Sequence, residues 1–206
     1  RMIAVGSKVR TDLLEAGIGR PDRFEVIHSG VALDAIPTRV QARRLLGLAD
    51  DVSVIAWVGR VTRIKRPDRL VEVTRLLAAR FPRVCIVVAG AGDQLPALAS
   101  AVDAESLPIH LLGWRDDIET VFAASDLALL TSDNEGTPLS LAQAGLCGIP
   151  AVASNVGSVS DVVIDERTGL LVAPDSTALA DACARLIADL PLRESLGIDR
   201  KSTRLN

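Results

Sequence analysis

The chain has 206 residues, enough for one domain of ordinary size and part of another. Hydrophobic residues make up 49% of it and charged residues 24%, a balance that excludes disorder and is typical of a globular protein. The net charge of -3 argues against nucleic acid as a partner bound through bulk charge. No apolar stretch reaches the length of about 18 residues that a membrane span needs.

The first part of the chain differs from the rest in its pattern of predicted strands and helices. Strands are predicted at 2–6 and 24–28 and helices at 9–16 and 41–46, with Pro37 in the bridge before the second helix. We interpret residues 1–36 as the end of an amino-terminal domain and its hinge. This interpretation implies that the chain begins within a longer protein.

From residue 52 onward, short apolar runs alternate with longer amphipathic segments. The apolar runs predict strands at 52–58, 84–89, 109–112, 127–130, 151–153 and 170–172. The amphipathic segments predict helices at 67–80, 93–102, 118–124, 137–147, 159–164 and 176–189, the last with Ser176 as its N-cap. Strands that are apolar throughout predict a parallel sheet covered on both faces. We therefore expect an α/β, doubly wound, Rossmann-like domain over residues 37–190, followed by a truncated or unrelated tail over 191–206.

Ligands of such sheets bind at the carboxyl ends of the strands, so the loops after the strands are the candidate sites. In the loop after the first of these strands, Gly59 allows a sharp turn, and Arg60 and Lys65 place two cations at the sheet edge. Arginine offers a planar fork to phosphate oxygens and lysine a mobile point charge. The loop is a candidate diphosphate site, although surface charges with incidental salt bridges would give the same pattern.

The loop 132–139 follows the fourth strand of this series. Gly136 permits close approach of a ligand, and Pro138 suits the first turn of the next helix. Free amides in that first turn favour an anion. Glu135 is either a capping carboxylate or an acceptor of hydrogen bonds from sugar hydroxyls.

A third loop, around Gly90 and Gly92, invites a dinucleotide-binding interpretation. Leu95 stands where the third glycine of that motif belongs, and the following strand ends without the acidic residue that would hold a ribose. An NAD-binding domain is therefore disfavoured, and the loop is expected to be a tight turn between strand and helix.

Histidine and cysteine give no sign of a metal site. His28 and His110 lie beside strands without further ligands at metal-binding spacing. Cys85, Cys147 and Cys183 are widely spaced in apolar stretches. We interpret them as buried thiols in a reducing compartment, so a cytoplasmic location is expected.

These loops, in this order, resemble the carboxyl-terminal half of a retaining GT-B glycosyltransferase of family 4, from about residue 2 to residue 190. The matching positions are Ser7, Val9, Asp12 and Leu13; the hinge 26–31; Gly59 and Arg60 with Lys65; Gly90 and Gly92; Gly113 and Trp114; and Glu135, Gly136, Thr137 and Pro138 with Ala144, Gly148, Pro150 and Val152. Each motif is weak alone, but six in the family's order and spacing are specific.

The resemblance implies that Arg60 and Lys65 bind the donor diphosphate and stabilise the leaving nucleotide, while Glu135 contacts the transferred sugar. The other implied donor-binding residues are Gly59, Gly90, Trp114, Arg115, Ile118, Asn134, Gly136, Thr137, Pro138, Leu139 and Gln143.

The implied reaction moves a sugar from a nucleoside diphosphate, with UDP expected from the family, to an acceptor with retention at the anomeric carbon. No metal and no other cofactor is expected. The acceptor, a sugar or a lipid-linked sugar, belongs to an amino-terminal domain that we expect this chain to lack. We expect no nucleic-acid partner and no membrane span, and a full-length protein would be compatible with a place at the inner membrane face.

One position departs from the family pattern. The family pairs its first glutamate with a second one, eight residues later, which accepts hydrogen bonds from the ribose hydroxyls, whereas this chain has Gln143 there. An amide oxygen still accepts a bond but loses its charge-assisted strength, so we expect weaker donor binding or a changed nucleotide preference. A non-catalytic nucleotide-sugar-binding module and a nucleotide-sugar epimerase of the same architecture remain alternatives.

Overall fold

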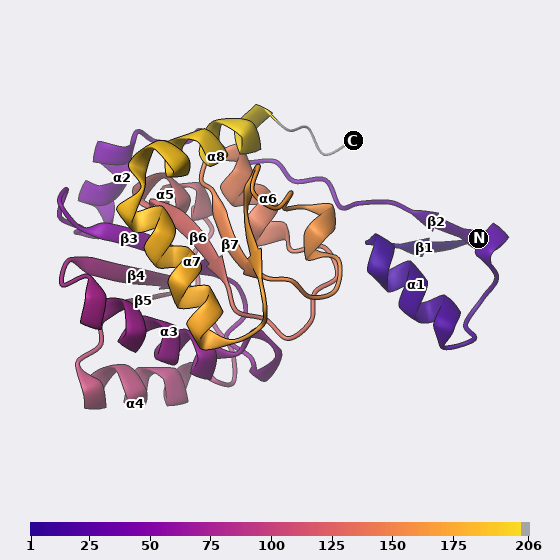
Figure 1. The fold of residues 1–206 in the computed structure, drawn as a ribbon, viewed down its shortest axis with the longest axis horizontal. Helices are drawn as coiled ribbons and strands as arrows, with labels where there is room; N and C mark the ends of the chain where they lie inside the picture. Colours follow the sequence, from indigo (N-terminus) through magenta and orange to yellow (C-terminus); the bar gives the residue numbers. More distant parts are fainter. Residues whose placement is uncertain (203–206) are drawn as a thin grey trace.

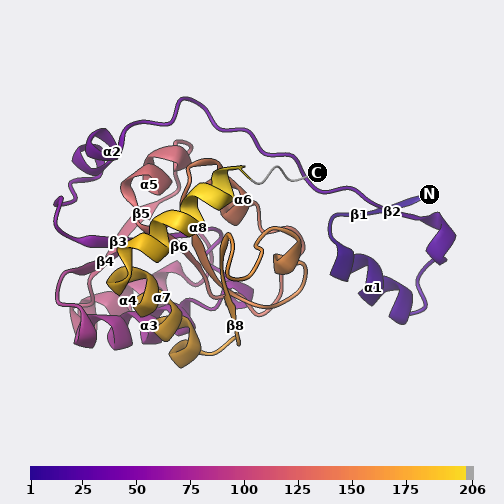
Figure 2. The ribbon, with the colours of Figure 1, turned by 45° about the horizontal axis from the view of Figure 1, so that its top comes forward.

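The computed structural model describes the backbone of residues 1–202 and the side chains of residues 1–199. A small amino-terminal unit stands beside a larger domain (Figure 1). The small unit contains strand β1 (Met2–Ala4), helix α1 (Ser7–Glu15), a 3-10 turn (Pro21–Arg23) and strand β2 (Phe24–Val26). β1 and β2 pair in parallel. Beyond them the chain runs without regular structure to the large domain (Figure 2).

The large domain begins with helix α2 (Arg39–Leu46). Its strands are β3 (Ser53–Val58), β4 (Val84–Ala89), β5 (Ile109–Gly113), β6 (Leu127–Leu130), β7 (Ala151–Ser154) and β8 (Gly169–Val172). Its other helices are α3 (Pro67–Arg80), α4 (Leu95–Glu105), α5 (Ile118–Ala124), α6 (Leu139–Leu146), α7 (Ser176–Ala188) and α8 (Leu190–Ser202). Two 3-10 turns, Arg63–Lys65 and Val159–Asp161, lie in its loops.

These six strands form one parallel sheet in the order β5-β4-β3-β6-β7-β8. From β3 the chain adds β4 and β5 on one side, and from β6 it adds β7 and β8 on the other. The direction of winding therefore reverses between β3 and β6, which confirms the predicted doubly wound α/β fold. In sheets of this kind, the crevice at the carboxyl ends of the two strands that flank the reversal is where ligands bind.

The sheet is buried on both faces because successive side chains of a strand point to opposite sides. In β3, Ile55 and Trp57 belong to the core beneath α3, α4 and α7, whereas Val54 and Ala56 belong to the core beneath α2, α5 and α6. Every residue of β4 is buried. This explains why the strands are apolar throughout rather than alternating with polar residues.

The helix predicted at 159–164 was wrong, because the chain forms only a 3-10 turn there, over Val159–Asp161. The other predicted helices exist, with differences at their ends that have local causes. α3 has Pro67 at its first position, as predicted. α6 is shorter than predicted because Pro138 lies at its N-cap, one residue before the first turn. α7 is capped by Asp175, whose carboxylate accepts from the Ala178 amide at 2.9 Å, so the expected Ser176 cap was wrong.

The segment after residue 190 is a further correction. It was expected to be a tail, but Leu190–Ser202 forms α8, which contacts α6, α7 and β8. Leu196 is 2% exposed and belongs to the core beneath α7. The periodicity of this short helix was missed because charged residues dominate the stretch around its few apolar positions. Residues 203–206, also assigned to the tail, lie outside the described residues.

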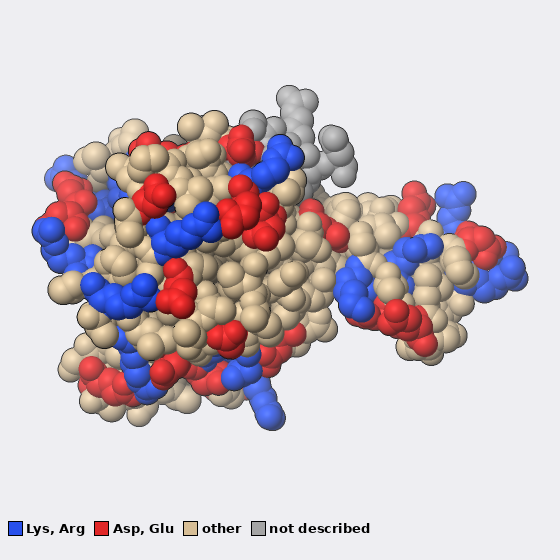
Figure 3. Space-filling view, in the orientation of Figure 1, with Lys and Arg blue, Asp and Glu red and all other residues tan. Residues whose placement is uncertain are grey.

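Surface charge is mixed in sign. On the face shown in Figure 3, Lys and Arg side chains of the large domain are interspersed with Asp and Glu side chains. Exposed ion pairs such as Arg80 with Asp181 and Arg185 with Glu166 contribute to this pattern. Pairs of this kind stabilise a fold by about 0–1 kcal/mol each, so the stability of the domain comes from its two apolar layers.

Candidate functional site

The loops after β3 and β6 meet at the carboxyl edge of the sheet because the two strands are hydrogen-bonded neighbours, with Ile55 opposite Leu127. Lys65, at the end of the first loop, donates a hydrogen bond from Nζ to Oε1 of Glu135 in the second loop. A cavity of about 570 Å³ opens between these loops and the loop after β5. Its size is in the range of small-molecule sites, about 300–1,000 Å³.

Most of the residues singled out in the sequence line this cavity. They are Gly59, Arg60, Lys65, Gly90, Trp114, Arg115, Ile118, Glu135, Thr137, Pro138, Leu139 and Gln143. Asn134 and Gly136 are not among its lining residues. The Asn134 side chain lies beside Gly157, and Gly136 lies against the side chain of Val5. Four lining residues were missed, namely Val58, Ala89, Asp116 and Ser140.

Little in the sequence indicated that the missed residues would line the cavity. Val58 and Ala89 are the last residues of β3 and β4, so they appeared to be core positions. Ser140 lies in the first turn of α6, one residue beyond the loop to which the motif pointed. The rule that places ligands at strand ends would have found Val58 and Ala89, had it been applied to the strands themselves.

The Lys65–Glu135 ion pair lies largely out of solvent, with side-chain exposures of 16% and 9%. The same oxygen of Glu135 also accepts from Ser132 Oγ at 2.6 Å, and Ser132 is completely buried. Two donors thus fix the orientation of the carboxylate. Because burial makes an unpaired charge costly, the two side chains hold each other at the cavity wall.

The other two cationic side chains of the cavity, Arg115 and Arg60, differ in whether they form an ion pair. Arg115 donates to Asp117 at 2.6 Å, and this hydrogen bond holds the pKa of the Asp117 carboxyl below its usual range. Arg60 is exposed at the end of β3, and none of the ion pairs recorded among the described residues includes it. Its guanidinium is therefore the one most available to an incoming anion.

The glycine-rich loop after β4 packs against the loop after β3. A Cβ atom at Gly90 would lie 1.8 Å from the Gly59 carbonyl oxygen, and one at Gly92 would lie 2.2 Å from the Val61 carbonyl oxygen. Backbone hydrogen bonds join the same loops, from Gly59 to Ala89 at 3.0 Å among others. The two glycines are thus required for close packing of the loops, which fits the interpretation of this segment as a tight turn.

The small amino-terminal unit touches the same region of the large domain. Thr137 Oγ1 donates to the Val5 carbonyl oxygen. At the start of α1, the Ser7 amide donates to Asp161 Oδ2 at 2.6 Å and the Lys8 amide to Ser158 Oγ at 3.1 Å. The loop that carries Glu135 is therefore bounded on one side by the chain segment that leaves β1.

The described residues contain neither a candidate metal site nor a candidate membrane span. No group of three or more His, Cys, Asp or Glu side chains has the arrangement of a metal site there. No described helix has the length and apolar character needed to cross a membrane. Cys85 and Cys183 are buried as expected, whereas Cys147 is partly exposed. Burial raises the pKa of the Cys85 thiol to about 11, so this side chain is not a nucleophile near neutral pH.

Comparison with known proteins gives a consistent result. The family model of glycosyl transferases group 1 matches residues 52–189. The D-inositol 3-phosphate glycosyltransferase of Mycobacteroides abscessus is 34% identical over 191 residues, covering 87% of this chain and 42% of the relative. That of Actinosynnema mirum is 36% identical over 192 residues, covering 85% and 46%. The chain thus spans less than half the length of these curated relatives.

Solved structures resemble the whole described fold. HepE of Anabaena, in complex with UDP-glucose, has a TM-score of 0.87 and 26% identity, covering 97% of this chain and 57% of that one. WaaG, a glycosyltransferase involved in lipopolysaccharide biosynthesis, shows likeness of fold, with a TM-score of 0.86 at 21% identity, covering 98% and 59%. The fold therefore defines an α/β domain of the GT-B glycosyltransferase type. More particularly, the chain belongs to the family of glycosyl transferases group 1.

Proposed function

We propose that this chain is the carboxyl-terminal, donor-binding part of a retaining glycosyltransferase of family 4, which transfers a sugar from a nucleoside diphosphate, UDP in the first instance, to an acceptor. The observation that carries the proposal is the meeting of Lys65 and Glu135 at the reversal point of the sheet, with Arg60 on the same cavity. The complex of HepE with UDP-glucose supports UDP as the nucleotide to test first.

The chemistry follows from the charges at the cavity. When the bond between the anomeric carbon and the phosphate oxygen breaks, negative charge develops on the departing diphosphate. Arg60 and Lys65 stabilise that charge electrostatically, and Glu135 accepts hydrogen bonds from the hydroxyls of the sugar. Trp114 is 78% exposed at the cavity rim, where its indole offers a flat surface to a nucleobase. This account requires no metal or other cofactor.

The experiment is a thermal-shift titration of the purified chain with UDP, GDP, ADP and NAD. We expect UDP to raise Tm and NAD to leave it unchanged, because a ligand at 100 times its Kd stabilises the native state by about 2.7 kcal/mol. Arg60→Ala and Lys65→Ala are expected to remove the UDP-induced rise. Arg80→Ala changes an arginine that pairs with Asp181 away from the cavity, so it serves as the control and should keep the rise.

The variants are compared by the rise in Tm that ligand causes, because Lys65→Ala also removes the cationic partner of Glu135 and lowers the Tm without ligand. An equal rise in wild type and in Arg60→Ala would remove the diphosphate site from the proposal. Stabilisation by NAD alone would instead favour the dinucleotide interpretation.

A non-catalytic nucleotide-sugar-binding module is the second candidate, and Gln143 is the residue that favours it. Its side chain lines the cavity on α6, in place of the carboxylate that the family pattern has there. Binding of a nucleotide sugar without transfer, in a protein that also carries an acceptor-binding domain, would support this second candidate.

A further inference from the structure

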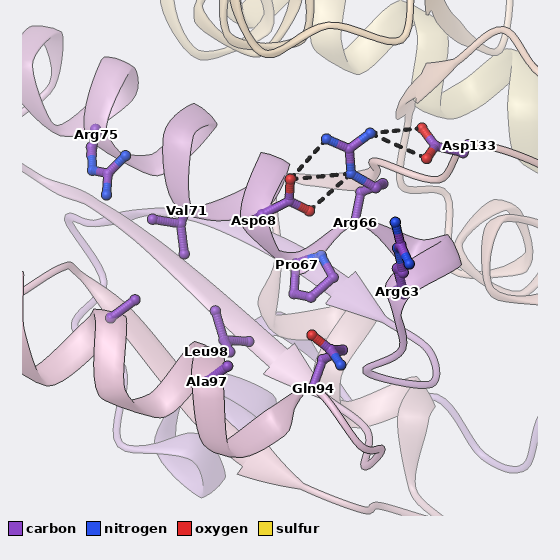
Figure 4. A pocket seen from close by; sticks show the side chains of 11 residues that line it. Arg63, Arg66, Pro67, Asp68, Val71, Arg75, Gln94, Ala97, Leu98 and Asp133 are labelled. Carbon is purple, nitrogen blue, oxygen red and sulfur yellow. Dashed lines mark hydrogen bonds and ion pairs between the residues drawn. The ribbon is translucent and has the colours of Figure 1, made fainter.

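Asp133, which is not among the lining residues of the cavity, is bound by two arginines that follow the first loop. Arg66 Nη1 donates to both carboxylate oxygens of Asp133, at 3.0 and 3.1 Å. Arg69 Nη2 donates to Asp133 Oδ1 at 2.8 Å, and its side chain is only 7% exposed. Arg66 also holds Asp68, with Nη2 to Oδ2 at 2.7 Å, so its guanidinium lies between two carboxylates (Figure 4).

The backbone of Arg66 is strained. Its φ of 56° and ψ of 61° are left-handed, a conformation that side-chain-bearing residues rarely adopt. Such a residue persists only where its surroundings over-determine it, and strain of this kind gathers at functional sites. Arg66 directly follows Lys65 and precedes the first turn of α3, so its conformation sets the direction in which the loop leaves the cavity.

Backbone and hydroxyl groups reinforce the same junction. The Asp133 amide donates to the Ile64 carbonyl oxygen at 2.9 Å. Thr131 Oγ1 donates to the Lys65 carbonyl oxygen at 2.6 Å and accepts from Trp57 Nε1 at 2.9 Å. These bonds join Ile64 and Lys65, which directly precede Arg66, to Asp133 and Thr131 on the chain segment that leads to Glu135. The two loops are therefore joined by backbone and hydroxyl hydrogen bonds close to the ion pair.

A second cavity of about 730 Å³ lies beside this junction, between α3 and α4, and three of its lining residues are arginines. Two of these arginines are already paired with carboxylates, because Arg66 is paired as described and Arg75 binds Glu72 and Glu105. Arg66 and Arg75 are thus alike in charge and in number of carboxylate partners. They differ in what they hold, since only Arg66 reaches the loop of Glu135.

We propose that Arg66 is a positioning residue: by holding Asp133 it fixes the spacing between Lys65 and Glu135, so that both side chains contact one nucleotide sugar at the same time. This inference rests on the proposed function of the cavity. In the proposed binding mode, the diphosphate contacts Lys65 and the sugar contacts Glu135, so a nucleotide sugar reaches both side chains and a nucleoside diphosphate reaches only Lys65. Loss of the spacing therefore weakens the binding of the nucleotide sugar more than the binding of the free nucleoside diphosphate.

The test compares Arg66→Gly with wild type and with Arg75→Ala. Glycine adopts a positive φ freely, so this change removes the side chain without adding backbone strain. In Arg66→Gly we expect the affinity for UDP-glucose to fall about tenfold and that for UDP to change less than about threefold, both measured by calorimetry. Arg75→Ala removes two ion pairs from the same cavity wall and should leave both affinities as in wild type.

A second readout needs no nucleotide. The rate at which acetic anhydride modifies Lys65 is measured by peptide mass spectrometry, and we expect it to rise in Arg66→Gly but not in Arg75→Ala. An unchanged rate, or an unchanged ratio of the two affinities, would overturn the positioning role. If wild type binds neither UDP nor UDP-glucose, the proposed function fails, and the modification rate still decides whether Arg66 positions Lys65.

Discussion

Gln143 and Glu135 line the same cavity, Gln143 on helix α6 and Glu135 on the loop before it. Glu135 is held by a lysine and a serine. Gln143 offers an uncharged amide oxygen where a carboxylate would attract two ribose hydroxyls. For the proposed donor site, we therefore expect the strength of donor binding to depend on whether residue 143 carries an amide or a carboxylate.

Gln143→Glu is expected to tighten UDP binding by about fivefold, because a hydrogen bond to a charged acceptor contributes about 1 kcal/mol more than one to a neutral acceptor. Calorimetric titration measures the gain. With 2′,3′-dideoxy-UDP, which lacks both ribose hydroxyls, the variant and wild type should bind equally. An unchanged affinity for UDP itself would show that residue 143 does not contact the ribose.

At the scale of elements, α8 is a helix that packs against the large domain at the end of its described chain. It follows α7 directly, and it contacts α6 and β8 as well. Leu196 lies in the core while Ile198, two residues further on, is 70% exposed. A helix with few apolar residues thus covers the sheet through two buried positions, Leu196 and Gly197, while Leu192 packs against the same core.

Leu196→Ala is expected to lower the free energy of unfolding by about 2–3 kcal/mol, the cost of a cavity in a packed core. Urea unfolding measures the change. Ile198→Ala, on the same helix but in solvent, should change the free energy by no more than about 0.5 kcal/mol. Equal effects of the two substitutions would mean that α8 contributes nothing to the core and that the segment behaves as a tail.

At the scale of the whole molecule, ion pairs join segments that lie far apart in the sequence, such as those of Arg66 and Arg69 with Asp133. Asp133 illustrates their response to pH. Burial acts to raise the pKa of its carboxyl, but hydrogen bonds from Arg69 and Arg66 outweigh this effect and the pKa is lowered. The pKa of Asp68 is lowered as well, chiefly by its hydrogen bond with Arg66.

A carboxyl with a lowered folded-state pKa stabilises the fold above its unfolded pKa of about 4, and this contribution is lost as the pH falls through the folded value. We therefore expect the urea midpoint to hold from neutral pH to about pH 5 and to fall below that. Asp133→Asn should lower the midpoint at pH 7 and reduce its further fall on acidification. A parallel fall in variant and wild type would exclude Asp133 from the acid response.

The sequence predicted much of the fold because the pattern is local. Each strand from β3 to β8 was predicted to within about one or two residues, since apolar runs bounded by glycine mark buried strands. Helix ends were less predictable, because caps such as Asp175 depend on side-chain hydrogen bonds. α8 was missed because charged residues surround its few apolar positions.

Sequence alone determined that this chain is a doubly wound α/β domain whose loops carry Arg60, Lys65 and Glu135, because strand periodicity and loop residues are properties of short segments. Only the tertiary structure decided the strand order, which makes β3 and β6 neighbours and brings Lys65 to Glu135 across 70 positions of the chain. It alone decided the Arg66–Asp133 junction as well, because an ion pair between two loops depends on the sheet that positions both of them.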